Sequence, residues 1–163
     1  MPASPSPYGR SGHFEPLDAP ARARWEKFGQ WERPLFPNVV GLRLEEARVD
    51  YARMRLPFRS ELCQPGGVVH GGAIATLIDT VVVPALAGTF DEPQFMLTID
   101  MQVRYLGTAR DTDLIAEGWV VRRGRSVSFC AAEVRREVDG EVVAEGWLVY
   151  KLSPQRASNA PSP

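Results

Sequence analysis

Asp79 is the residue of this sequence with the clearest chemical potential. It is the single carboxylate of residues 66–88, which are mostly glycine or apolar. An ionised carboxylate in such surroundings is costly unless a partner compensates for the lost water. A partly desolvated carboxylate is also an effective base or nucleophile. Two interpretations therefore stay open: a catalytic carboxylate, and a structural one that is hydrogen-bonded to the backbone or to a tyrosine.

The start of the same stretch is the second candidate, because His70 is followed by Gly71 and Gly72. The first N–H groups of a helix that begins here are unpaired and carry a partial positive charge. Glycine lets a substrate carbonyl approach the backbone closely, which is the geometry of an oxyanion hole. Gln64, in the preceding loop, offers a side-chain amide as a second donor. The structural alternative is a helix cap and a tight turn.

Other chemistries find little support in the sequence. The two histidines, His13 and His70, and the two cysteines, Cys63 and Cys130, fit neither a zinc site nor a disulfide framework. The net charge of −1 gives no general attraction to nucleic acid or to anionic membranes. No apolar run reaches the roughly 20 residues of a membrane span. We therefore expect no metal, no cofactor, no nucleic-acid or membrane partner, and a cytoplasmic protein with reduced thiols.

The periodicity of apolar residues predicts the elements that must position these groups. Residues 71–88 are apolar on nearly every side, which is typical of a buried helix, and Pro84 is expected to kink it or end it early. Asp139-Gly140 predicts a tight hairpin. The other expected elements are a short helix at 19–31 and strands at 41–49, 51–58, 95–107, 113–121, 126–138 and 141–152. This order favours an α+β protein with one antiparallel sheet wrapped around one helix.

The segment HGGAIATLID, residues 70–79, resembles the signature of the hotdog-fold acyl-CoA thioesterases of the phenylacetic-acid-degradation (PaaI-like) type. The similarity extends over roughly residues 39–152. It implies the hotdog fold, with about six antiparallel strands around a long central helix, and hydrolysis of an acyl-CoA to a free acid and CoA without a cofactor. We expect this domain to span residues 19–153. The ends, residues 1–18 and 154–163, are rich in Pro, Ser or Gly, and we expect them to be disordered tails.

The resemblance also implies a role for each site residue. Asp79 matches the catalytic carboxylate, as base or nucleophile, and Gly71 matches the amide that polarises the thioester carbonyl. His70 matches a histidine that orients a neighbouring polar group or assists the leaving thiolate. Gln64 falls where many members carry asparagine, and Thr98 where members carry a hydroxyl that helps to hold the water. Alternation places Thr98 on the face opposite its apolar neighbours, so it reaches the site only if the strand start is twisted or the site lies off the main helix face.

Coenzyme A needs cations for its phosphates, and Arg122, Arg123 and Arg125 form a dense basic cluster at an expected turn. The alternative interpretation of this cluster is a solvated turn. The resemblance implies CoA contacts in this region, for which Arg123, Arg125 and Ser126 are the candidates.

Gly71 and Asp79 are eight residues apart, which is about 12 Å along a helix. One carbonyl cannot touch both within one chain, whereas two antiparallel helices bring Asp79 of one chain to Gly71 of another. We therefore expect a homodimer with shared active sites, and the resemblance implies that such dimers pair into a homotetramer. Two alternative functions stay open: a hotdog hydratase or dehydratase acting on enoyl thioesters, and a non-catalytic acyl-CoA binding domain.

Overall fold

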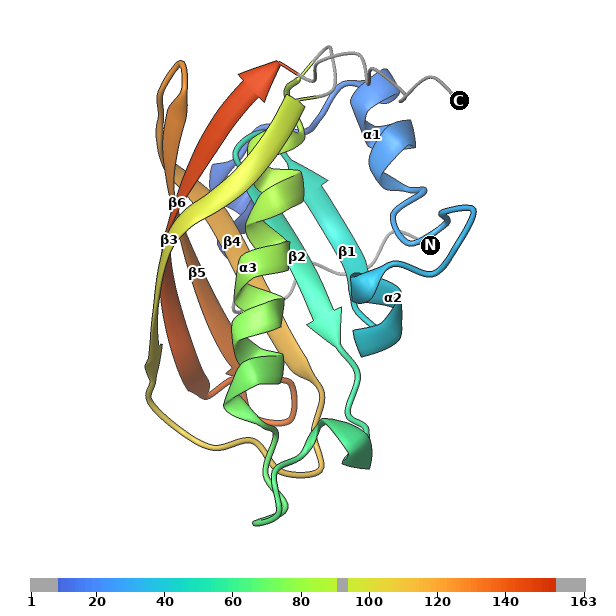
Figure 1. Ribbon diagram of the computed structural model, residues 1–163, viewed down its shortest axis with the longest axis vertical. Helices are drawn as coiled ribbons and strands as arrows, with labels where there is room; N and C mark the ends of the chain where they lie inside the picture. The colour runs from blue at the N-terminus through green and yellow to red at the C-terminus, as the bar shows by residue number, and fades with distance from the viewer. Residues whose placement is uncertain (1–8, 91–93, 155–163) are drawn as a thin grey trace, which may run out of the picture.

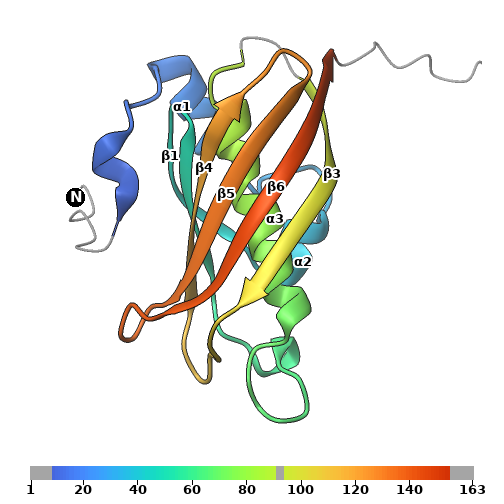
Figure 2. The same ribbon diagram turned by 90° about the vertical axis from the view of Figure 1, so that its left-hand side faces the viewer.

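One long helix, α3 (Gly71–Ala87), lies against one antiparallel sheet in the computed structural model, which describes residues 9–90 and 94–154 (Figure 1). The six strands follow the order β1-β2-β4-β5-β6-β3, and most of this order can be followed across the sheet in Figure 2. They are β1 (Arg43–Arg48), β2 (Tyr51–Leu56), β3 (Gln94–Tyr105), β4 (Leu114–Arg123), β5 (Val127–Arg136) and β6 (Val142–Pro154). The predicted hotdog architecture is confirmed.

The core forms where α3 meets the concave face of the sheet. Leu77, Ile78, Val81 and Val82 of the helix are fully buried, as expected of a helix that is apolar nearly all round. Close approach depends on glycine in the sheet. A Cβ atom at Gly118 would lie 2.8 Å from the side chain of Val81.

Pro84 lies inside the helix and does not end it, so the expected early stop is wrong, whereas the expected kink stays a prediction. A proline inside a helix removes one backbone hydrogen bond and costs roughly 3 kcal/mol. Pro84 and the two residues after it are buried, and this packing holds the last turn in helical form as far as Ala87.

The short helices differ from the prediction. α1 (Ala19–Trp25) begins at the predicted residue, where the Asp18 side chain accepts a hydrogen bond from the Ala21 N–H. It ends six residues before residue 31, ahead of a turn that leads to Gly29 at a positive φ of 84°. An additional helix, α2 (Phe36–Val40), was not predicted; the other short elements are the 3₁₀ helices η1 (Arg10–His13) and η2 (Ser60–Leu62).

Residues 9–18, expected to belong to a disordered tail, pack on the sheet instead. The Arg10 N–H donates to Glu117 Oε1 at 2.8 Å. The ring of Phe14 stacks on Tyr51, with 5.0 Å between their centroids. The prediction missed these contacts because they join residues far apart in the sequence. The rest of both predicted tails, except residue 154 at the end of β6, lies outside the described residues.

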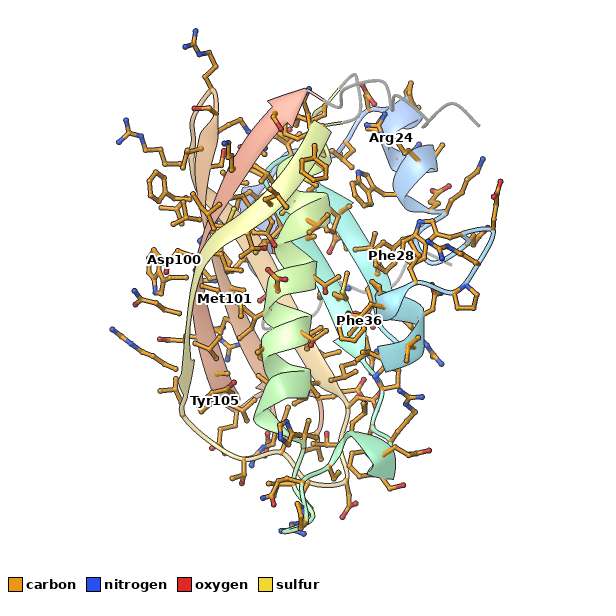
Figure 3. All side chains as sticks on the ribbon, viewed as in Figure 1. Arg24, Phe28, Phe36, Asp100, Met101 and Tyr105 are labelled. Atoms are coloured by element: carbon orange, nitrogen blue, oxygen red, sulfur yellow. The ribbon has the colours of Figure 1, made fainter. Side chains whose placement is uncertain are left out.

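A β-bulge in β3 determines which of its side chains face α3. Thr98 lies opposite Tyr150 of β6, the register then shifts, and Met101 lies opposite the core residue Leu148. Since successive side chains of β6 alternate between faces, Thr98 and Met101 both face the helix. Asp100 points away from it (Figure 3). The extra residue therefore reverses the predicted orientation at the start of the strand.

None of the helices in the described parts of the chain has the length and hydrophobicity that crossing a membrane requires.

Candidate active site

Asp79 lies on the face of α3 that looks toward β3 and β6, and two hydroxyl groups hold its carboxylate. Thr98 Oγ1 donates to Asp79 Oδ1 at 2.8 Å. The hydroxyl of Tyr150 lies 2.7 Å from the same Oδ1 and 2.7 Å from the backbone carbonyl oxygen of Asp79. Within the described residues Oδ2 accepts no hydrogen bond, and Asp79 is partly exposed. The carboxylate thus has one bound oxygen and one free oxygen.

Tyr150 itself is 3% exposed. Burial raises its pKa above the ordinary value, and the negative charge of Asp79 raises it further. The hydroxyl therefore keeps its proton at the pH of most enzyme assays and stays a hydrogen-bond donor. Of the two interpretations of Asp79, the predicted contact with a tyrosine is present, and it is compatible with a chemical role for the free oxygen.

The first turn of α3 presents a free amide. His70 caps the helix, and its Nδ1 accepts the Gly72 N–H at 2.8 Å, so the proton of a neutral His70 ring is on Nε2. The Gly71 carbonyl accepts from the hydroxyl of Tyr105 at 2.8 Å. The backbone N–H of Gly71 has no acceptor among residues 9–90 and 94–154. This amide is free to bind an anionic or carbonyl oxygen.

Gln64 lies in the loop before α3, where its side chain folds back on its own turn. Gln64 Oε1 accepts the Gly66 N–H at 2.6 Å, which leaves the amide nitrogen as its available donor. Gln64 also lines a surface hollow together with Cys63 and Arg110.

These groups form two clusters at different heights of the helix, separated by about 12 Å along its axis. Asp79 contacts Thr98 at one cluster, and Gly71 contacts Tyr105 at the other. Both contacts involve β3, with Tyr105 near the start of α3 (Figure 3). The two clusters therefore face the same edge of the sheet, although within one chain they lie too far apart to act on one carbonyl group.

Comparison with known proteins identifies the family. The model of the thioesterase superfamily matches residues 66–143. A protein of Halobacterium salinarum, named as a candidate esterase, is 38% identical over 107 residues, which cover 63% of this chain and 70% of that protein. The chain belongs to the thioesterase superfamily. The predicted class of enzyme, a thioester hydrolase, is thereby confirmed at the level of the family.

Other members of the superfamily resemble this thioesterase over shorter or more divergent stretches. Human acyl-coenzyme A thioesterase 13 is 27% identical over 81 residues, 49% of this chain and 57% of the human protein. A solved structure of a thioesterase-superfamily protein is 31% identical, with a TM-score of 0.72, and covers 83% of this chain and 100% of its own. A thioesterase of Haemophilus influenzae has a TM-score of 0.74 at 19% identity, covering 80% and 90% of the two chains, and it shows the fold alone.

The predicted CoA-binding residues of this thioesterase differ in their availability. Arg123 donates to Asp50 Oδ1 at 2.5 Å and lies 5.4 Å from the ring centroid of Phe90. Arg125 is exposed and has no ion-pair partner within the described residues. Ser126 accepts a backbone hydrogen bond from Leu152. Of the predicted cations Arg123 and Arg125, Arg125 is therefore the more available, and the turn between β4 and β5 lies at the opposite end of the molecule from the loop before α3 (Figure 1).

Sequence reasoning missed two residues of the site, Tyr150 and Tyr105. A signal for Tyr150 was present. It lies two residues after Leu148 and four after Gly146 in β6, so all three are expected on the face of the strand that points to the core. A buried tyrosine needs a partner for its hydroxyl, and a lone carboxylate in an apolar stretch needs a donor. No comparable signal marks Tyr105, which belongs to the exposed edge strand. No group of three or more His, Cys, Asp or Glu side chains in the described residues is arranged to hold a metal ion.

Proposed function

We propose that this protein hydrolyses an acyl-CoA thioester to a free carboxylic acid and CoA, with Asp79 as general base or nucleophile. The observation that carries the proposal is the carboxylate of Asp79, which has Oδ1 held by Thr98 and Tyr150 and Oδ2 unbonded by any of the described residues. A carboxylate held in this way can activate a water molecule or attack a carbonyl carbon. Resemblance to the PaaI-like enzymes and to acyl-coenzyme A thioesterase 13 supports CoA as the thiol.

The site that we propose is shared between two copies of the chain. β3 is an edge strand that pairs only with β6 in the described sheet. Its apolar side chains Leu97, Ile99, Met101 and Tyr105 are exposed. An exposed edge strand with apolar side chains is a template for pairing with another chain. We infer that a second copy covers this edge.

The register of that pairing follows from the two contacts on β3. The β-bulge adds one residue to the segment between Thr98 and Tyr105, so its centre, counted along the register with β6, lies at Gln102, opposite Trp147. An antiparallel β3–β3 pair with its twofold axis at this centre sets Thr98 of one copy opposite Tyr105 of the other. Asp79 of one copy is then brought toward Gly71 of the second copy. This arrangement supplies the base and the amide that one chain keeps apart.

Each remaining group has a place in the shared site. The Gly71 N–H would receive the thioester oxygen and stabilise the oxyanion that forms. Gln64 would add a side-chain donor, and the Nε2–H of His70 would face the leaving thiolate. We place the CoA phosphates at the β4–β5 turn, where Arg125 has no ion-pair partner among the described residues and Ser126 is exposed, whereas Arg123 would contribute after release from Asp50. In the antiparallel dimer, this turn lies toward the same end as Gly71 of the second copy. Pairing of these dimers into a homotetramer stays a prediction.

A thiol-release assay tests the proposed function. The protein is incubated with aryl, short-chain and long-chain saturated acyl-CoAs, and free CoA is measured. We expect release from at least one class. Hydration of an enoyl-CoA without thiol release would instead show a hydratase, and saturable binding with no turnover would show a binding domain.

A further inference from the structure

The two oxygens of the Asp79 carboxylate are in different environments. Oδ1 accepts from Thr98 and lies 2.7 Å from the hydroxyl of Tyr150, whereas Oδ2 has no donor among the described residues. Hydrogen bonds to a carboxylate oxygen stabilise its negative charge and lower its basicity. The unbonded oxygen is therefore the more basic and the more nucleophilic of the two.

The position of Tyr150 is itself tightly constrained. It lies on β6 directly opposite Thr98 and is buried. Its hydroxyl also contacts the backbone carbonyl of Asp79, so it reaches both the main chain and the side chain of one residue. A donor in contact with both groups limits rotation of the Asp79 side chain about its Cα–Cβ bond.

We propose that Tyr150 is a positioning residue, which together with Thr98 holds Oδ1 of Asp79 so that Oδ2 is the oxygen that acts on water or on the thioester. Tyr150 itself does not touch the substrate. The catalytic consequence of this inference rests on the proposed function. The contact between Tyr150 and Asp79 is independent of that function.

The groups around Tyr150 allow it to remain a donor during turnover. The titratable groups that face it are Asp79 from α3 and Cys130 from β5. Burial raises the pKa of the Cys130 thiol to about 12, so this thiol stays neutral in an assay. Deprotonation of Tyr150 would place a second negative charge against Asp79, which opposes it. Tyr150 therefore acts by holding the carboxylate and not by giving up its proton.

The test compares Tyr150→Phe with a matched control, Tyr51→Phe. Both changes keep the ring and remove one buried hydroxyl. Tyr51 is fully buried and donates to Glu117 Oε1 at 2.5 Å, on the face of the sheet that points away from α3. We expect Tyr150→Phe to lower kcat by about 10- to 100-fold with little change in KM, because small misplacement of a reacting group is costly. Tyr51→Phe should lower the thermal midpoint and leave kcat within about twofold of the wild type.

Two further readouts separate positioning from stability. Because Tyr150 is proposed to act through Asp79, adding Tyr150→Phe to an Asp79→Asn variant should lower kcat no further. A crystal structure of Tyr150→Phe, which needs no substrate, should show the Asp79 carboxyl turned away from its orientation in the wild type.

The crystal structure keeps this inference separate from the proposed function. If no thioester is cleaved, the proposed function and the catalytic consequence fall together, whereas a turned Asp79 carboxyl in Tyr150→Phe still supports the Tyr150 contact. An active Tyr150→Phe variant with unchanged kcat and an unchanged orientation of the Asp79 carboxyl would overturn the inference. An equal loss of kcat in Tyr51→Phe would also overturn it, because a general loss of packing would then explain both.

Discussion

Thr98 donates a 2.8 Å hydrogen bond to Oδ1 of Asp79, although simple alternation along its strand turns it away from the helix. The β-bulge that follows Thr98 is the reason, because it reverses the phase of the side chains on β3. One extra residue in an edge strand thus decides whether a hydroxyl reaches the candidate site.

Replacement of Asp79 by asparagine tests the proposed base or nucleophile. The asparagine side chain keeps an oxygen that can accept from Thr98 and Tyr150, so the fold should be retained. Loss of the carboxylate should lower kcat by about 10² to 10⁴, while binding of product CoA, measured by calorimetry, stays close to that of the wild type. Turnover near the wild-type rate in a folded Asp79→Asn variant would refute the assignment.

The Gly71 amide can be removed without disturbing the helix cap. Gly71 is the first residue of α3, a position that tolerates proline because its N–H is unpaired within the helix. Gly71→Pro should lower kcat by about 10² to 10³, the usual cost of losing one oxyanion donor. Gly71→Ala is the matched control: its Cβ also approaches the Tyr105 ring, at 3.2 Å, but it keeps the N–H. Equal losses in the two variants would assign the effect to crowding and not to the amide.

The hydroxyl of Thr98 is tested by a pair of substitutions of similar size. Thr98→Val keeps the branched shape and removes the donor, whereas Thr98→Ser keeps the donor and removes a methyl group. Loss of a hydrogen bond to a charged group should reduce kcat by about tenfold in Thr98→Val. Thr98→Ser should stay within about threefold of the wild type. The opposite order, measured by thiol release, would show that packing of the methyl group matters more.

Arg125 is the arginine whose loss should affect CoA most directly. Arg125→Ala should raise KM for an acyl-CoA more than for an acyl thioester that lacks the nucleotide, because a phosphate contact serves only that half of the substrate. The control is Arg122→Ala, which removes the same charge from the end of β4. Arg122 lies opposite the exposed Phe129 of β5, and its loss should change KM little. A similar change of KM for both substrates would indicate a merely solvated turn.

Mixed dimers test whether each site draws on two chains. Gly71→Pro and Asp79→Asn are co-expressed with different tags, and dimers that carry both tags are isolated. In a shared-site dimer, one site of each mixed dimer holds both lesions and the other holds none. Without selection, random pairing makes about half of the dimers mixed and leaves about a quarter of all sites intact, as twofold symmetry requires.

The purified mixed dimers should therefore recover about half of the wild-type activity per dimer. The experiment requires that each variant alone is folded, dimeric and nearly inactive. If all site residues acted within one chain, every site would carry a lesion, and verified mixed dimers would stay inactive.

Much of the fold follows from local patterns in the sequence. The central helix and the six strands are marked by their own apolar periodicity, and Gly71 and Asp79, one from each cluster of the site, lie inside the segment that the motif marks. The short elements were less predictable. α1 is shorter than expected and α2 was absent from the prediction. The reason is that a short segment with a weak intrinsic preference for helix forms one only where packing stabilises it.

By itself, the sequence determined that Asp79 and Gly71 lie on one buried helix and are too far apart to act together in one chain. Only the tertiary structure decided what holds them. Tyr150 meets Asp79 and Tyr105 meets Gly71 across 71 and 34 residues of chain, and Arg123 is engaged by Asp50 across 73 residues. Such contacts depend on the hydrogen-bond register of whole strands, including the bulge at Thr98. That register is set by packing of the entire sheet against α3, and no local residue pattern encodes it.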